Sequence, residues 1–375
     1  MKIKTFKVEQ WMNEFENDAV YNLGETCIDS LKLGELLDVC GVSHEEFFAK
    51  LADTRLTYSH IYGSPDFLKG VAGLYENVKP ECVIPTHGAV GANNQIIHTL
   101  IEPTDNMVCV MPTYQQHYSI PESIGAEVRI LQLRPENAFL PDIEELKSLV
   151  DENTKMITFN NPDNPTGSWI PRESMEAMVE VARSIGAYVL CDEVYRGISE
   201  DGSYMHSVVD LYEKGISVGS MSKIFSLAGL RMGWIATRDE EVVELVRGRR
   251  DYDTISCGVI DDMLASMALA NKEAIFARNR EILLKNRAIL DQWVNETEGV
   301  HYVRPVAGTT ALVYYDMDIP SYDLCVRLIR EKGLLFTPGS AFEMEGAVRI
   351  GYAFDSKLLK QGLDQFGDFL KENRK

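Results

Sequence analysis

The order of apolar and polar positions predicts a chain built mainly from strand-then-helix units. Short apolar runs, each long enough for one strand, occur at 82–85, 108–111, 127–133, 155–159, 187–191 and 215–219. Helical spacing of apolar residues fills several of the gaps, at about 88–100, 142–151 and 172–185. Strands that are apolar throughout, alternating with helices, are typical of a mostly parallel sheet covered on both faces.

The remaining pattern predicts further helices and a second, smaller domain. Helical spacing occurs at 31–52 and 65–78, and residues 272–298 contain neither Gly nor Pro, which favours one long helix. After it, short strands (301–303, 310–315, 347–351) alternate with helices (322–332, 356–372), as in an α+β domain. We expect residues 1–30 to be an N-terminal segment of the small domain, 31–275 the large domain, and 276–375 the small C-terminal domain.

Composition and charge exclude several classes of function. The formal charge of −20 argues against a nucleic-acid partner, which needs a basic surface. The first 16 residues contain no signal-peptide-like apolar run, and no run is long enough to span a bilayer, so we expect no membrane partner. The seven cysteines include no CxxC and the seven histidines no HExxH. We therefore expect reduced thiols, a cytoplasmic location and no metal site.

Polar and aromatic side chains follow directly after the predicted strands: Tyr114, Asn164, Asp192, Tyr195, Ser220 and Lys223. Ligands of open parallel sheets bind at the carboxyl ends of the strands. These side chains are therefore predicted to share one site.

Lys223 is the most informative of them. It follows a buried strand in Ser220-Met221-Ser222-Lys223, and Arg231 lies eight positions further on. Burial lowers the pKa of an amine, and a neutral amine attacks aldehydes. The serines and the arginine suit a phosphate, and an aldehyde that carries a phosphate describes pyridoxal phosphate (PLP). The alternative is a solvated lysine in a polar loop near an unrelated arginine.

Other charged and glycine-rich positions agree with this hypothesis. Asp192 closes an apolar strand and needs a cationic partner, such as a protonated pyridine nitrogen. The glycine turn at 88–92 leads into a helix, whose N-terminus suits a phosphate, although this signal is weak by itself. It does not match GxGxxG, which argues against a nicotinamide dehydrogenase. Arg349 lies in an apolar run and needs an anion, for which a substrate carboxylate is a candidate.

Together these motifs resemble the class I/II aminotransferases, which are fold-type I PLP enzymes. The resemblance extends from about Tyr58 to Arg349, and its motifs occur in the family order: Asn-Pro-Asp-Asn-Pro-Thr-Gly (161–167), Asp-Glu-Val-Tyr (192–195), Ser-Met-Ser-Lys (220–223), Gly-Leu-Arg-Met-Gly (229–233) and Pro-Gly-Ser-Ala-Phe (338–342). It implies an α/β fold with a mostly parallel, seven-stranded large domain and a smaller α+β domain. The implied reaction is transfer of an amino group from an L-amino acid to a 2-oxo acid, by a ping-pong mechanism.

The resemblance also implies a role for each matched residue. Lys223 would form the Schiff base with PLP and move the substrate proton, and Asp192 would pair with the pyridinium nitrogen. Asn164 and Tyr195 would bind the ring oxygen, and Tyr114 would stack on the ring. The phosphate would be held by Ala89 and Val90 through their backbone N–H groups, and by Ser220, Arg231 and, with less support, Ser222.

The substrate contacts implied by the resemblance are Arg349 for the α-carboxylate, together with Asn164 and Gly24. Tyr58 matches a position that reaches the phosphate of a neighbouring subunit, which implies a homodimer. Family members often carry a second glycine shortly after the first, whereas Gly24 is followed by Glu25-Thr26-Cys27. We expect Glu25 or Thr26 to touch a substrate or narrow the cavity, unless residues 21–26 form an ordinary turn.

Two questions stay open at this point, and a third interpretation is disfavoured. The charged segment 247–253 either selects a polar substrate side chain or is a solvated helix end. A lyase, decarboxylase or cyclase, including one for arginine-like amino acids, would use the same scaffold. A PLP-binding regulatory module is disfavoured, because the segment before Tyr58 is too short for a DNA-binding domain and the chain is acidic.

Overall fold

The computed structural model describes residues 2–199 and 204–373. Its centre is a seven-stranded sheet in the order β2-β8-β7-β6-β5-β3-β4. The strands are β2 (Val83–His87), β3 (Asn106–Met111), β4 (Glu127–Gln132), β5 (Thr154–Asn160), β6 (Tyr188–Asp192), β7 (Gly215–Ser220) and β8 (Met232–Thr237). β8 pairs antiparallel with β2 and β7, and the other neighbours pair in parallel. The predicted mostly parallel sheet is confirmed, and β8 is the strand that the sequence pattern missed.

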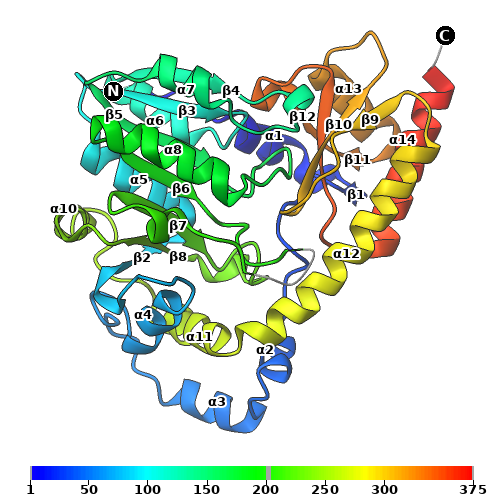
Figure 1. Cartoon of the computed structure of the whole chain (residues 1–375). Helices are drawn as coiled ribbons and strands as arrows, with labels where there is room; N and C mark the ends of the chain where they lie inside the picture. Colours follow the sequence, from blue (N-terminus) through cyan, green and yellow to red (C-terminus); the bar gives the residue numbers. More distant parts are fainter. Residues whose placement is uncertain (1, 200–203, 374–375) are drawn as a thin grey trace.

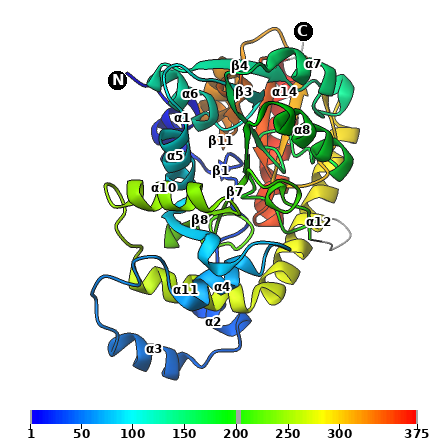
Figure 2. The same ribbon diagram turned by 60° about the vertical axis from the view of Figure 1, so that its left-hand side comes forward.

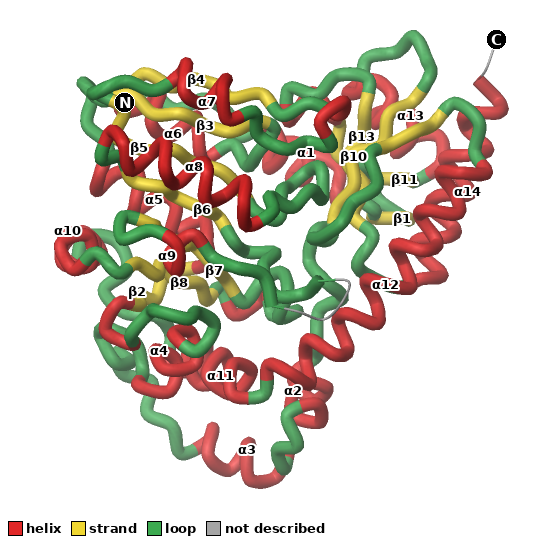
Figure 3. Tube along the Cα trace, viewed as in Figure 1, coloured by secondary structure: helices red, strands yellow, loops and turns green. Residues whose placement is uncertain are grey.

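Helices cover both faces of this sheet (Figure 1, Figure 3). One face packs against α5 (Gly88–Leu100), α6 (Gln116–Ile124) and α10 (Glu240–Arg250). The other packs against α4 (Pro65–Ala72), α7 (Ile143–Leu149), α8 (Arg172–Ile185), α9 (Val208–Leu211) and α11 (Val259–Ala270). β6 shows the reason: Leu190 points into the first apolar cluster, whereas Val189 and Cys191 point into the second.

A second group of elements follows the long helix α12 (Lys272–Glu296), which runs diagonally between the two parts in Figure 1. An antiparallel sheet in the order β12-β13-β10-β9 packs with α13 (Ser321–Lys332) and α14 (Ser356–Asn373). Its strands are β9 (Val300–Tyr302), β10 (Thr310–Tyr315), β12 (Thr337–Pro338) and β13 (Ala347–Gly351). Short 3-10 helices occupy Glu16–Asp18, Pro80–Cys82, Pro135–Asn137, Ala228–Leu230 and Gly339–Phe342.

The N-terminal segment joins this second group. β1 (Tyr21–Asn22) pairs in parallel with β11 (Leu334–Leu335). This pairing supports the division into residues 1–30, 31–275 and 276–375, which remains a proposal.

Several helices differ from the expectations. Residues 31–52 form two helices, α2 (Leu33–Val39) and α3 (His44–Ala52), because Gly41 adopts φ +64° and breaks the run. The helix predicted at 65–78 ends at Ala72, before Gly73. The pattern also missed α1 (Lys7–Phe15), whose buried face is Val8, Trp11 and Phe15.

α1 is attached to both parts of the molecule. The Trp11 indole N–H donates to the Phe336 carbonyl at 2.8 Å, which ties the helix to the second group. The Lys7 backbone N–H donates to the Gln115 side chain at 2.8 Å, which ties it to the loop before α6. Figure 1 shows α1 between the large sheet and β12, and the turned view of Figure 2 shows it near α6. Within the described residues, each helix is too short or too polar to cross a membrane.

Candidate active site

A cavity of about 520 Å³ lies at the carboxyl ends of β5, β6 and β7. Nearly every predicted site residue lines it: Gly24, Ala89, Val90, Tyr114, Asn164, Asp192, Tyr195, Ser220, Ser222, Lys223, Arg231 and Arg349. The exception is Tyr58, which is 72% exposed and lies with Leu56 and Cys257 at a separate surface hollow. A single chain therefore brings together all of the predicted site residues except Tyr58, which is expected to serve a neighbouring subunit.

The Lys223 amine lies inside this cavity. Its Nζ donates to the Thr26 hydroxyl at 2.6 Å and to Cys27 Sγ at 3.6 Å. Burial acts to lower its pKa, but Tyr195, Cys27 and Glu25 act in the opposite direction and together raise it above the ordinary value. In the protein alone the expected depression of the pKa is therefore wrong, because acidic groups surround the amine. Thr26 and Cys27, which follow Gly24, therefore contact the lysine, whereas a contact of Glu25 or Thr26 with a substrate stays a prediction.

Asp192 is 3% exposed and held by neutral donors. The Asn93 side-chain amide donates to its Oδ2 at 2.9 Å, and the Val194 backbone N–H donates to its Oδ1 at 3.2 Å. His117 Nε2 lies 3.8 Å from Oδ2, and the other ring nitrogen of His117 bonds Thr158 Oγ1. No Lys or Arg of the described residues pairs with Asp192, so this buried carboxylate still accommodates a cation in the cavity.

The opposite end of the cavity is built for an anion. α5 begins at Gly88, so the backbone N–H groups of Ala89 and Val90 are in its first turn. Gly88 has φ +67°, and a Cβ built on it would lie 2.9 Å from Arg231 Nη2, so glycine lets the guanidinium approach the helix N-terminus. A Cβ on Gly233 would lie 2.8 Å from the Ala89 nitrogen.

Two serine hydroxyls complete this end. Ser220 is 2% exposed at the end of β7, and its Oγ accepts from the Ser222 backbone N–H at 3.3 Å. A helix N-terminus, two hydroxyls and an arginine are together a phosphate-binding set.

Arg349 lies on β13 and is 3% exposed. Its guanidinium donates to Asn164 Oδ1 at 3.1 Å, to the Gly24 carbonyl at 2.8 Å and to Thr337 Oγ1 at 2.9 Å. These acceptors are neutral, and Nε is buried without a hydrogen-bond partner. Burial lowers the pKa of this arginine. A buried guanidinium with neutral partners is suited to a ligand carboxylate.

Sequence reasoning missed the wall of the cavity that α1 supplies. Phe6, Val8, Glu9, Met12 and Glu16 line it. The signal was present, because Val8, Trp11, Met12 and Phe15 are spaced as one apolar helix face.

Tyr114 contacts this wall. Its hydroxyl donates to Glu9 Oε1 at 2.9 Å, and its ring lies 4.8 Å from that of Phe6. Burial and the Glu9 carboxylate raise the pKa of Tyr114. Asn93, Gln116 and Asn160 also line the cavity without having been predicted.

The segment 247–253 does not line this cavity. Arg250 is buried, at 1% exposure, and donates to the carbonyls of Pro85 and Ile61, whereas Tyr252 is 94% exposed. The segment is therefore the end of helix α10. Its Arg250 neither lines the cavity nor lies in solvent, because it is buried and binds backbone carbonyls.

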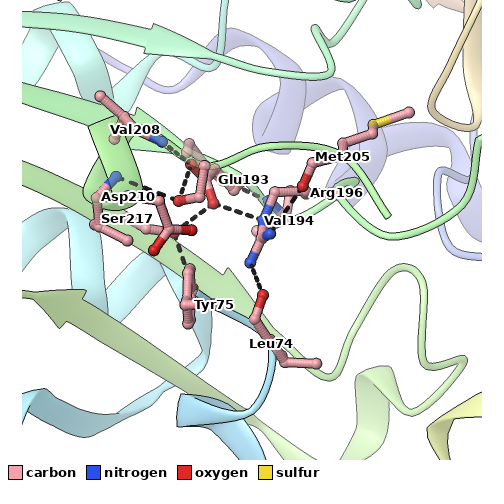
Figure 4. Close-up of polar contacts among 12 residues, drawn as sticks. Leu74, Tyr75, Glu193, Val194, Arg196, Met205, Val208, Asp210 and Ser217 are labelled. Atoms are coloured by element: carbon pink, nitrogen blue, oxygen red, sulfur yellow. Dashed lines mark hydrogen bonds and ion pairs between the residues drawn. The ribbon is translucent and has the colours of Figure 1, made fainter. Parts of the chain in front are cut away.

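A larger cavity of about 740 Å³ lies elsewhere, beside Tyr75, Arg196 and His206. Arg196 pairs with Glu193 at 2.7 Å and donates to the carbonyls of Met205 and Leu74 (Figure 4). Its charge is thus matched within the fold. The smaller cavity is the candidate active site, because it carries the charged groups whose counter-ions the described residues do not supply.

PLP fits the residues of the smaller cavity. Its phosphate matches the α5 N-terminus with Ser220 and Arg231, and its pyridinium nitrogen matches Asp192. Its aldehyde carbon matches the Lys223 amine, which lines the same cavity. Within residues 2–199 and 204–373, no group of three or more His, Cys, Asp or Glu side chains is arranged to hold a metal ion.

Comparisons with known proteins place most of the chain in one family. A model of the aminotransferase class I and II family matches residues 24–366. Capreomycidine synthase of Streptomyces vinaceus is 29% identical over 359 residues, which is 95% of this chain and 91% of that protein. Aspartate/prephenate aminotransferase of Thermus thermophilus is 25% identical, with 85% of each protein covered.

Solved structures extend the likeness to the whole chain. A PLP-dependent aminotransferase from Streptococcus suis superposes with a TM-score of 0.97 at 45% identity, with both chains fully covered. The PLP-dependent cyclase OrfR superposes with a TM-score of 0.92 at 22% identity, covering 100% and 99%, and shows the shared fold alone. The chain therefore belongs to the class I and II aminotransferase family, as a fold-type I, PLP-dependent transaminase.

Proposed function

We propose that this protein transfers the amino group of an L-amino acid to a 2-oxo acid in two half-reactions that use the same cavity in turn, which predicts ping-pong kinetics. One observation carries the proposal. Lys223, Asp192 and Arg349, from three distant parts of the sequence, line a single cavity of about 520 Å³. A base, a carboxylate for a cationic ring and a receptor for a substrate carboxylate are the groups that this reaction needs.

Arg349 binds and orients the amino acid. Its guanidinium, buried among neutral acceptors, takes the α-carboxylate in a charge-assisted contact. Asn164 and Gly24 hold the guanidinium in place through their oxygens, so the carboxylate is fixed relative to both domains. This fixed position sets the Cα hydrogen toward one side of the cavity.

Lys223 moves the proton. When it is bound, PLP supplies the electron sink that makes the Cα hydrogen acidic. In its neutral form, the Lys223 amine would accept that proton and return it to a carbon of the cofactor, as a general base and then a general acid. Thr26 keeps the amine within the cavity through its 2.6 Å hydrogen bond.

The remaining residues would hold the cofactor. Asp192 would keep a positive charge on the ring nitrogen, supported by Asn93. Tyr195 and Asn164 would bind the ring oxygen, and Tyr114 would pack against the ring. The N-terminal turn of α5, with Ser220, Ser222 and Arg231, would bind the phosphate.

We also propose a homodimer in which Tyr58 of each copy reaches the phosphate end of the other active site. The exposure of Tyr58, at 72%, and its distance from its own cavity lining support this assignment. A cytoplasmic location remains a prediction, with which the seven free cysteines agree.

A spectral half-reaction tests the proposed function. The PLP-loaded protein is mixed with single amino acids, without an acceptor, and the visible cofactor band and products are followed. Stoichiometric loss of the band with release of the matching 2-oxo acid is expected. Carbon dioxide, ammonia or a cyclised product, released over many turnovers with the band retained, would instead identify a decarboxylase, lyase or cyclase.

A further inference from the structure

The charged residues of the cavity fall into two groups. Lys223, Asp192, Arg231 and Arg349 are assigned by the proposed function, on which the present inference rests. The second group consists of three carboxylates that the reaction does not use, Glu9, Glu16 and Glu25. All three come from the N-terminal segment, which also contributes the apolar side chains of Phe6, Val8 and Met12.

The three carboxylates have neutral partners. Glu9 accepts from the Tyr114 hydroxyl at 2.9 Å, and Glu16 accepts from the Asn22 amide at 3.4 Å. Glu25 Oε1 accepts from the backbone N–H groups of Thr26 and Cys27. Among residues 2–199 and 204–373, none of the three forms an ion pair with Lys or Arg. Glu25 acts through space on the charges of Lys223 and Arg349, and Glu9 acts on that of Arg349, but no direct ion pair of the described residues neutralises any of the three carboxylates.

The position of these carboxylates beside Arg349 bears on the choice of substrate. Glu9, Met12 and Glu16 lie three and four positions apart, on one face of α1 and the turn that follows. Met12 Sδ lies 3.4 Å from where a Cβ on Gly24 would stand, and the Gly24 carbonyl accepts from Arg349. The acidic face thus borders the carboxylate receptor.

No further cation lines the cavity to receive a second substrate carboxylate, since its described basic residues are Lys223, Arg231 and Arg349. A substrate whose α-carboxylate binds Arg349 is placed beside α1, because Gly24 contacts both Arg349 and Met12. Apolar atoms there suit methylene groups, and carboxylates suit a terminal cation.

We infer that the preferred amino donor carries a positively charged side chain at the end of a methylene chain, an ammonium or a guanidinium, selected by Glu9 and Glu16 with support from Glu25. A dicarboxylic amino acid would place its second carboxylate against the like charges of Glu9 and Glu16. The acidic face therefore also excludes aspartate and glutamate.

The test compares isosteric substrates on the PLP-loaded enzyme. L-Arginine and L-citrulline have side chains of similar shape but differ in charge, and L-glutamate supplies the opposite charge. Loss of amino acid is measured by mass spectrometry in the presence of a 2-oxo acid. We expect kcat/KM for arginine to exceed that for citrulline by about tenfold or more, and glutamate to react more slowly than either.

Variants locate the effect on α1. The double variant Glu9→Gln/Glu16→Gln is expected to lower the arginine-to-citrulline ratio about tenfold, because it removes both charges without touching Lys223. Glu14→Gln is the matched control: it removes one charge from the same helix, and Glu14 is exposed and outside the cavity lining. Its ratio is expected to stay that of the native enzyme. The ratio compares two substrates on one protein, so partial misfolding or cofactor loss cancels.

A ratio near one in the native enzyme, a preference for glutamate, or an unchanged ratio in the double variant overturns the inference. Failure of the proposed function gives a different result. Amino acid would then disappear without the matching 2-oxo acid, while the ratio still reports the side-chain preference. If none of the amino acids is consumed, the dissociation constants of arginine and citrulline are measured by calorimetry. Tighter binding of arginine would support the inferred side-chain preference, and equal binding would overturn it.

Discussion

Arg349 donates a hydrogen bond to the side-chain oxygen of Asn164 at 3.1 Å, across 185 positions of sequence. Asn164 lies in the loop after β5 of the large sheet, and Arg349 lies on β13 of the small one. One bond therefore joins the two sheets at the wall of the cavity. The proposed carboxylate receptor and a proposed ligand of the cofactor ring hold each other in place, so any shift of one sheet against the other moves both.

Replacing Arg349 by Lys is expected to lower kcat/KM for amino acids by about tenfold to a hundredfold, because an ammonium cannot present the paired donors of a guanidinium. The control is the corresponding amine without an α-carboxylate, assayed with both proteins. Its much lower rate is expected to be the same in each. A substitution that slows amine and amino acid equally would show that Arg349 acts on folding and not on the carboxylate.

Replacing Lys223 by Ala is expected to reduce the half-reaction more than about a hundredfold, because the proton carrier is lost. The phosphate contacts are untouched, so the variant is expected to retain PLP, as measured by absorbance after desalting. Added small amines should restore part of the rate. Normal release of 2-oxo acid by this variant would remove Lys223 from the proposed mechanism.

The buried network in Figure 4 predicts a stability effect away from the cavity. Glu193 pairs with Arg196 at 2.7 Å and accepts from Ser217 Oγ at 2.7 Å, and the paired side chains are 2% and 4% exposed. Glu193→Gln leaves a buried guanidinium without its counter-charge, which is expected to cost roughly 3 kcal/mol. A lowering of Tm by several degrees in a thermal melt is the expected observation.

The matched control for that network is Glu180→Gln. Glu180 pairs with Arg183 at 3.3 Å, but its side chain is 71% exposed. Water screens such a pair, so Tm is expected to change by less than about one degree. Equal changes in Tm for the two substitutions would show that burial does not make the Glu193–Arg196 pair more important than the exposed one.

Asp163 predicts a dependence of stability on pH. Burial raises its pKa from 3.8 to about 7, although Thr166 opposes the shift by donating to Oδ2 at 2.6 Å. The folded state therefore holds a proton that the unfolded state releases between about pH 4 and pH 7. The contribution of Asp163 to stability is fully present below that window and is lost as the pH rises through it, by up to about 1.4 kcal/mol per pH unit.

Asp163→Asn removes this titration and keeps an oxygen that accepts from Thr166. The Tm of the variant relative to the native protein is expected to be higher at pH 8 than at pH 5, measured by calorimetry at both values. A difference in Tm that does not change with pH would show that Asp163 is ionised in the folded protein throughout.

Local pattern was sufficient for much of the fold. Continuously apolar strands and helices with periodic apolar residues predict the large parallel sheet, because burial on two faces leaves a signal in every few residues. The polar residues at the carboxyl ends of those strands, from Tyr114 to Lys223, likewise follow from topology, since parallel strands end at one edge. Short motifs then added the family resemblance.

Other features depend on contacts that no local pattern records. β8 runs antiparallel between β2 and β7, and α1 packs over the cavity through partners such as Phe336, far along the chain. Burial would lower the pKa of Lys223, but Tyr195, Cys27 and Glu25 raise it, and the last two come from the other end of the sequence. Sequence alone was enough to predict most of the polar residues that meet in the cavity. The tertiary structure decided which charges face one another across the cavity, because Coulomb interactions depend on distance in space and not on distance along the chain.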